Sequence, residues 1–118
     1  MTDKLQPGPE ADARVAEAMG WTDVRPSDNP DCGDRLIGKC GRGYGFIPPY
    51  TTTGDGLLAM LEWGARNFPR WYLRHPGSFY EASFVAENEM DYYAWAATPN
   101  LAVAEALLAA VDEKEKDK

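Results

Sequence analysis

The residues best suited to hold a ligand lie where a loop leads into a predicted helix. Thr51, Thr52 and Thr53 stand directly before an amphipathic run that starts near Asp55. A helix N-terminus exposes unpaired backbone N–H groups and the positive end of a dipole, and together these bind phosphate or carboxylate groups. Turn 48–55 is therefore the first candidate ligand site. Alternatively, Thr52 or Thr53 only caps the helix, and the Asp55 carboxylate, which would occupy the same positive end, favours that alternative.

Arginines and tyrosines form the second group with binding chemistry. Arg66, Arg70 and Arg74 cluster in an otherwise acidic chain and could clamp a phosphate or carboxylate group. Alternatively, they form a solvated face whose side-chain stems cover tryptophan rings. Tyr44 and Tyr50 lie in predicted loops, where functional residues concentrate. The candidate ligand-binding residues are Tyr44, Tyr50, Thr51, Thr52, Thr53, Arg66, Arg70 and Arg74.

Further aromatic residues recur at strand spacing and could stack a base. Alternating aromatics in strands more often form core, so we expect most of them to be plain packing. They are Trp63, Trp71, Tyr72, Tyr80, Tyr92, Tyr93 and Trp95.

Catalytic chemistry has little support in the sequence. His75 is the only histidine, and it has no cysteine or serine nucleophile beside it. A general base needs partners that orient it, and the sequence reveals none. We therefore predict no catalytic residue and no cofactor, and a binding protein is favoured over an enzyme.

Metal ligands are equally sparse. Cys32 and Cys40 lie eight residues apart, and a zinc site would need two more ligands from a chain with one histidine. We expect both to be structural thiols and leave open whether they pair. Glu87, Glu89 and Asp91 alternate without matching a calcium-loop spacing, which indicates a solvated hairpin tip.

Composition narrows the class of partner. The chain has 118 residues, 44% of them hydrophobic, which fits one packed domain. Its formal net charge of −7 repels phosphate backbones, so we expect no duplex nucleic acid, although the arginine cluster could hold a small anionic or nucleotide ligand. No apolar run is long enough to span a membrane, and the first residues lack the features of a signal peptide. We therefore expect a cytoplasmic protein, in the host cytoplasm if it is phage-encoded.

The first half of the chain predicts one helix and a long loop. Residues 1–9, rich in proline and glycine, are expected to be disordered, and a helical pattern runs from Glu10 to a stop at Gly20. Residues 22–45 contain many proline, aspartate and glycine residues and read as a loop with one short strand over 35–39. Residues 44–50 should then run extended into the next turn.

The second half predicts a helix, three strands and a final helix. An amphipathic stripe from Leu57 to Phe68 follows the threonines, with Thr52 as its expected N-cap. Strands are expected over 71–75, 78–86 and 91–97, and a helix opened by Thr98 over 100–113. The fold is then one α+β domain over 10–113, with an antiparallel sheet of about three to four strands between helices in α-β-α layers, and a charged tail over 114–118.

Three segments also carry a family likeness. They are VAEAMGW at 15–21, PYTT at 49–52 and WAATPNLAVA at 95–104. In order and spacing they resemble the Met-Gly-Trp, Tyr-Ser-Thr and Ala-Pro-Leu-Ala segments of the phage ABA sandwich family, small phage-encoded proteins with a sheet between helices. The chain departs from that pattern in having threonine where the family often has serine, and in its insert over 32–45. The resemblance implies the sandwich fold and a phage context.

The favoured interpretation is a non-enzymatic, homo-oligomeric phage protein that binds a small ligand, in its sharpest form a nucleotide-type signal of bacterial immunity sequestered at turn 48–55. The first alternative is a protein–protein interaction module that inhibits a host factor, and the second is an enzyme that degrades a nucleotide. An interaction module predicts an exposed apolar patch and no pocket. A ligand site predicts that Tyr50, Thr52 and an arginine converge on one concavity.

Overall fold

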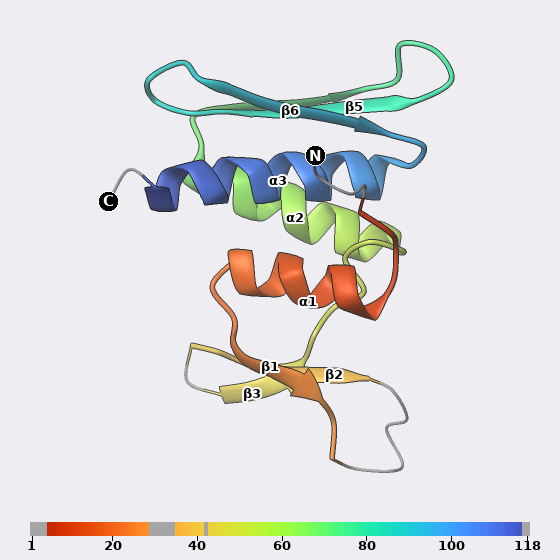
Figure 1. Cartoon of the computed structure of the whole chain (residues 1–118), viewed down its shortest axis with the longest axis vertical. Coiled ribbons are helices and arrows are strands. Elements are labelled where there is room, and N and C mark those ends of the chain that lie inside the picture. The colour runs from red at the N-terminus through yellow and green to blue at the C-terminus, as the bar shows by residue number, and fades with distance from the viewer. Residues whose placement is uncertain (1–4, 29–34, 42, 117–118) are drawn as a thin grey trace.

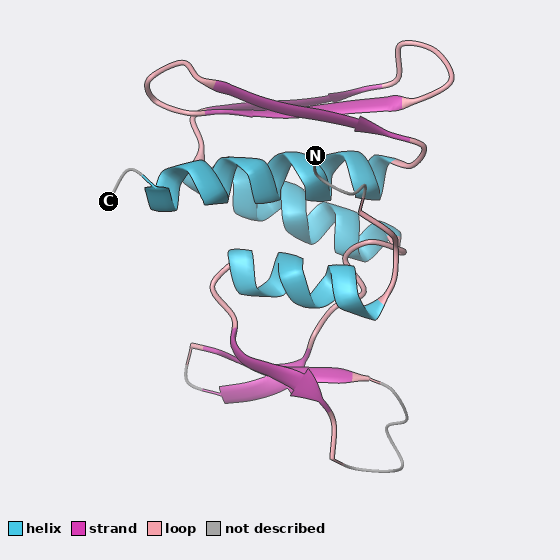
Figure 2. Cartoon of the chain, in the orientation of Figure 1, coloured by secondary structure: helices cyan, strands magenta, loops and turns pink. Residues whose placement is uncertain are grey.

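The described residues form three helices between two antiparallel sheets (Figures 1 and 2). The structure is a computed structural model that describes residues 5–28, 35–41 and 43–116. In chain order the elements are α1 (Pro9–Ala18), β1 (Thr22–Pro26), β2 (Leu36–Cys40), β3 (Gly43–Phe46), α2 (Gly54–Asn67), β4 (Arg70–Arg74), β5 (Tyr80–Val85), β6 (Asp91–Ala96) and α3 (Pro99–Lys116).

The larger sheet, β4–β5–β6, is the hairpin meander that the sequence predicts, and its strand bounds agree with the expected ones within two residues. Phe84 pairs with Trp71 on one side and with Tyr92 on the other. Ala82 and Phe84 are buried against the helices. Since side chains alternate along a strand, Ser83 and its cross-strand partners face away from the helices.

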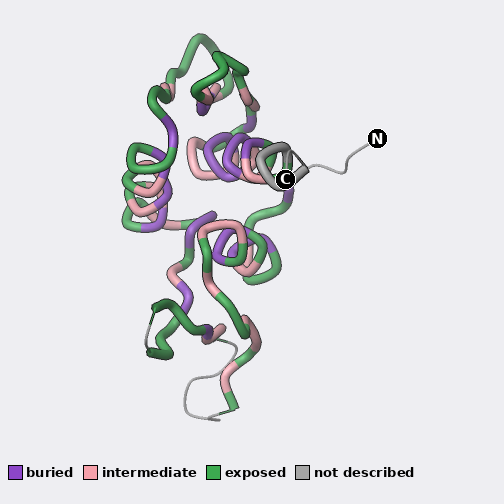
Figure 3. The backbone as a smooth tube through the Cα atoms, turned by 90° about the vertical axis from the view of Figure 1, so that its left-hand side faces the viewer, coloured by how far each residue is buried: buried purple, intermediate pink, exposed green. Residues whose placement is uncertain are grey.

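Helix α3 lies at the centre of the molecule. It packs on β5 and β6 with one side and on α1 and α2 with the other (Figure 1). Its start is the predicted one, because the Thr98 hydroxyl accepts a hydrogen bond from the Leu101 N–H at 3.2 Å. Small residues let neighbouring elements approach it from all sides, and its fully buried residues are Ala102, Val103, Ala104, Ala106, Leu107 and Ala110. Figure 3 shows buried segments, in purple, in the helices between the two sheets.

Helix α2 begins one residue later than the sequence suggested. Thr53 is its N-cap, and the Thr53 hydroxyl accepts from the Gly56 N–H at 3.0 Å. Thr52, the expected cap, is exposed. Asp55 lies in the first turn and Arg66 in the last, so both charges complement the helix dipole.

A second sheet, β1–β2–β3, corrects the prediction of a long loop over 22–45. Its strands are short, and a bulge between Thr22 and Arg25 holds Asp23 at φ 53°, in the left-handed region. Aspartate tolerates that conformation better than most residues. Proline, aspartate and glycine therefore mark irregular strands here, where composition alone predicted a loop.

The predicted class, α+β with an antiparallel sheet packed on helices, is confirmed. The order of the layers differs from the expected α-β-α arrangement, since the helices lie between the sheets (Figure 1). The small sheet accounts for the difference: β1 packs on α1, and Leu36 and Ile47 join the hydrophobic core.

The N-terminal segment packs on the domain from Leu5 onward, although residues 1–9 were expected to be disordered. Leu5 is buried, and its N–H donates to Glu105 Oε1 at 3.2 Å. The Gly8 N–H donates to the Thr51 hydroxyl at 3.0 Å. Residues 1–4 lie outside the described residues. None of the helices in the described part of the chain is both long and apolar enough to cross a membrane.

Candidate binding surface

The outer face of β4–β5–β6 carries aromatic and charged side chains in register. Tyr72, Ser83 and Tyr93 form one row across the sheet, and Arg74, Glu81 and Trp95 form the next. Both rows alternate with the buried positions, so they lie on the side away from the helices. In Figure 1 no described element lies over this face of the sheet.

Three rings form a continuous aromatic strip on this face. The strip is Phe79, Tyr93 and Trp95, with exposed fractions of 38%, 53% and 51%. The ring centroids of Tyr93 and Trp95 lie 5.8 Å apart, and those of Phe79 and Trp95 lie 6.3 Å apart. The two ring planes of each pair are tilted by 35° and 59°, so no parallel slot exists between them. The strip is therefore an exposed aromatic surface without a slot between its rings.

A buried serine hydroxyl lies at the centre of the face. Ser83 is 1% exposed and its hydroxyl donates to the Asp91 carboxylate. Burial raises the pKa of Tyr72, and the Asp91 and Glu81 carboxylates raise it further, while a hydrogen bond with Ser83 lowers it in part. Ser83 thus links Tyr72 of β4 to Asp91 of β6 beneath the exposed rings.

Both arginines on the face are paired with carboxylates of the chain. The Arg74 guanidinium bonds to the Glu81 carboxylate, which raises the pKa of Arg74, and lies 5.4 Å from the centre of the Tyr72 ring. Arg70 pairs with Glu89 at 3.6 Å. A shallow depression of about 640 Å³ lies around Arg70, Tyr72 and Asp91, and another of about 440 Å³ lies beside Phe79 and Trp95.

The predicted ligand residues of turn 48–55 serve the fold. The Tyr50 side chain is 2% exposed, and its hydroxyl accepts from Trp21 Nε1 at 3.2 Å. Asp12 Oδ1 accepts from both the N–H and the hydroxyl of Thr51, at 2.8 and 2.7 Å. The Thr53 hydroxyl caps α2, and only Thr52 is exposed. Ligand binding at this turn stays a prediction, but three of its four predicted residues already have intramolecular partners.

The other predicted site residues lie in separate parts of the molecule. Tyr44 is exposed on β3, where its hydroxyl donates to Asp23 Oδ2 at 2.8 Å and lowers the pKa of Asp23. Arg66 is exposed near the end of α2. Arg70 and Arg74 lie on β4, in the sheet at the opposite end of the molecule from β3 (Figure 1). Of the predicted residues, the structure brings only these two arginines to one face.

Sequence reasoning missed the aromatic strip. Tyr93 and Trp95 were among the aromatics at strand spacing, most of which were expected in the core. Their neighbours Tyr92 and Ala94 are the ones that pack on the core. Alternation groups Tyr93 and Trp95 on one side of β6, but no signal in the sequence says which side of the sheet α3 covers.

His75 and the cysteines are the remaining candidates from the sequence. His75 Nδ1 lies 2.7 Å from the Phe79 carbonyl oxygen, and its ring stacks on Tyr80 at 4.3 Å. Among the residues that the structure describes, no three histidine, cysteine or acidic side chains gather as metal ligands. Cys40 is an exposed free thiol, and Cys32 lies outside the described residues, as does any pairing between them.

No protein-family model matches the chain, and no curated protein matches it either.

Proposed function

We propose that the protein is a non-enzymatic interaction module whose outer sheet face binds a partner protein with an apolar centre and a basic rim. The observation that carries the proposal is the exposed aromatic strip of Phe79, Tyr93 and Trp95. Tyrosine, tryptophan and arginine dominate the energetic centres of protein interfaces, and this face contains all three.

The charge of the chain supports a basic rim on the partner. Arg74 and Arg70 are already paired with Glu81 and Glu89, so the carboxylate of Asp91 is in excess on the face. The whole chain has a net charge of −7. Two copies of it would repel each other, whereas a basic partner would be attracted and would associate faster at low salt. In the phage context that the resemblance implies, such a partner is a host factor.

A nucleotide-type ligand is the second candidate function. One observation favours it: the Arg74 guanidinium lies 5.4 Å from the centre of the Tyr72 ring, and Tyr93 and Trp95 lie on the same face across β5. A base could stack on a ring of this face while a phosphate meets the arginine. The acidic surroundings of Glu81 and Asp91 oppose an anion at this place. Homo-oligomerisation also stays a prediction, and the light-scattering measurement described below tests it.

The test places a photo-crosslinking phenylalanine derivative, which keeps an aromatic ring, at position 95 of the full chain, with a matched variant at Leu58, an exposed apolar residue on α2. The proposal expects one protein to be crosslinked from position 95 and not from position 58. Excess unlabelled wild-type chain should compete for that crosslink, whereas excess Trp95→Ala chain should not. Equal crosslinking from both positions would overturn the proposal.

Two further measurements distinguish the other occupants. Light scattering that shows a dimer, converted to a monomer by Trp95→Ala, would assign the face to a second copy of the chain and contradict the proposal. Calorimetry with mononucleotides and cyclic nucleotides should show no heat of binding. Binding that Trp95→Ala abolishes would replace the protein partner by a nucleotide.

A further inference from the structure

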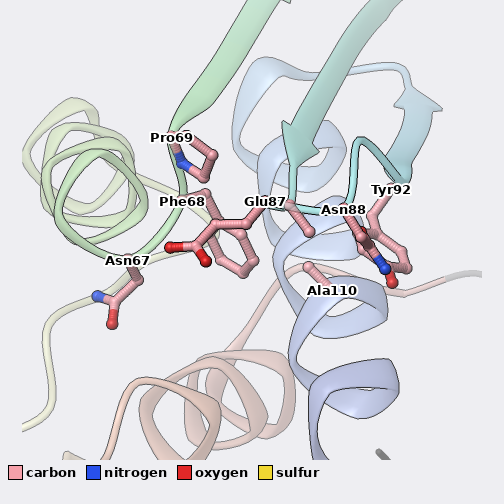
Figure 4. A pocket seen from close by; sticks show the side chains of 8 residues that line it. Asn67, Phe68, Pro69, Glu87, Asn88, Tyr92 and Ala110 are labelled. Carbon is pink, nitrogen blue, oxygen red and sulfur yellow. The ribbon is translucent and has the colours of Figure 1, made fainter.

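A cavity of about 320 Å³ lies between the end of α2, the turn after β5 and the last turns of α3 (Figure 4). Phe68 and Ala110 are buried and line its base, and Tyr92 is half-buried at its side. Asn67, Glu87 and Asn88 are exposed at its mouth. The volume is at the lower end of the range for small-molecule sites.

The electrostatics of this cavity favour a cation. Helix α2 ends at Asn67, so the negative end of its dipole lies at the mouth. Figure 4 shows the Glu87 carboxylate extending from the turn toward α2, beside Phe68. Among the residues that the structure describes, no lysine, arginine or histidine lines the cavity, although Arg66 and Arg70 are close to it in sequence.

The two glutamates of the turn differ in their partners. Glu89 has φ +67° and pairs with Arg70 at 3.6 Å. Glu87 makes no ion pair with any residue in the described part of the chain. The Asn88 side-chain oxygen accepts from the Met90 N–H at 3.1 Å, which fixes the turn between them. Glu87 is thus a carboxylate at the cavity mouth that has no ion-pair partner among the described residues.

We infer that this cavity binds an organic ammonium group, with Glu87 as its counter-ion and the Tyr92 ring as its aromatic wall. An ammonium group over an aromatic face gains from the ring quadrupole, and more so when partly desolvated. Either a free alkylammonium compound or the lysine side chain of a peptide would supply that group. The inference does not depend on the proposed function, since the cavity and the aromatic strip share no residue.

The test titrates the full chain with choline and follows the backbone amide signals of Asn67, Glu87, Asn88 and Ala110 by NMR. The neutral carbon analogue, 3,3-dimethylbutan-1-ol, has the same shape without the charge. We expect choline to bind with a dissociation constant of about 1–10 mM, as so few atoms allow, and the neutral analogue about tenfold more weakly or not at all. Equal binding of the two, or no shift at these amides with choline, would overturn the inference.

Substitutions distinguish the contribution of the Glu87 charge to binding from that of the turn that holds it. Glu87→Gln should weaken choline binding about tenfold, and Tyr92→Ala should do the same while Tyr92→Phe retains the ring and the binding. Glu89→Gln, on the same turn but outside the cavity, should change it by less than about twofold, in line with the small effects of screened exposed charges. An equal loss in Glu87→Gln and Glu89→Gln would contradict the assignment.

A further arm identifies the source of the ammonium group. Nα-acetyl-lysine methylamide replaces choline in the same titration. Tighter binding of the lysine compound supports a peptide side chain as the natural occupant, and tighter binding of choline supports a free ammonium compound. Absence of binding by both overturns the inference. Trp95→Ala should leave these titrations unchanged, so failure here and failure of the proposed function are distinguishable.

Discussion

Gly64 lies against the ring of Phe84, so closely that a β-carbon at position 64 would overlap it. The contact joins α2 to the inner face of β5, and Phe84 is among the largest fully buried side chains. The sheet therefore sits at a separation from the helices that only glycine allows at this point. This places the outer face, and the strip on it, at a fixed distance from the core.

Gly64→Ala should lower the free energy of unfolding by about 1–3 kcal/mol, because the added methyl forces Phe84 or α2 to move in a packed core. Chemical denaturation measures the effect. Gly54→Ala is the matched control, since a β-carbon there meets nothing within 4 Å. That control should change stability by less than about 0.5 kcal/mol, as for most surface positions. Similar losses in both variants would show that the contact is looser than described.

Thr53→Ala should lower stability by about 1 kcal/mol, because the Gly56 N–H loses its acceptor at the start of α2. Thr52→Ala should leave stability almost unchanged, since Thr52 is exposed and is not the cap. Thermal unfolding of the two variants side by side measures the difference. A larger loss of stability for Thr52→Ala would show that Thr52, as the sequence predicted, is the N-cap of α2.

Tyr50 should make stability fall at alkaline pH. Burial raises the pKa of its phenol above the unfolded value, although the hydrogen bond from Trp21 offsets part of the rise. The neutral phenol therefore contributes its full stabilisation below the unfolded pKa of about 10, and this is lost as pH rises through the folded-state pKa. Tyr50→Phe should be less stable at pH 7 by about 1 kcal/mol, having lost one hydrogen bond, but its stability should fall less steeply above pH 10.

Unfolding followed across pH 8 to about 11 checks this slope, a range that spans the unfolded tyrosine pKa. Tyr72 also has a raised pKa, so part of the slope should persist in Tyr50→Phe and disappear further in the double variant with Tyr72→Phe. Identical slopes in the wild type and the double variant would contradict the burial effect.

The second half of the fold could be predicted because its signals are local. Alternation over 78–86, the turn at Glu87 and the Thr98 cap each lie within a few residues of the element they define. The small sheet could not be predicted in this way. Its strands have four or five residues, and their pairing joins Pro26 to Leu36 across a segment rich in proline, aspartate and glycine. These strands are mostly exposed, and they are held by packing of β1 on α1 more than by local propensity.

The candidate surface was only half predictable for a related reason. Alternation places Tyr93 and Trp95 together on one side of β6, but both sides of this sheet carry aromatic residues. Which side meets water depends on where α3 packs, and that is a tertiary property. Likewise, nothing in the types of Tyr50 and Thr51 distinguishes a ligand site from buried hydrogen bonds to Trp21 and Asp12.

The most direct test of the interaction surface uses the partner protein that the crosslinking identifies, purified by itself. This partner is titrated with the wild-type chain and with the variants Trp95→Ala, Tyr93→Ala and Leu58→Ala. Trp95→Ala and Tyr93→Ala should each weaken binding by about tenfold or more, as expected of aromatic hot spots, with unfolding free energies close to that of the wild type. Leu58→Ala should bind as the wild type does. Equal affinity of all four chains would contradict the account.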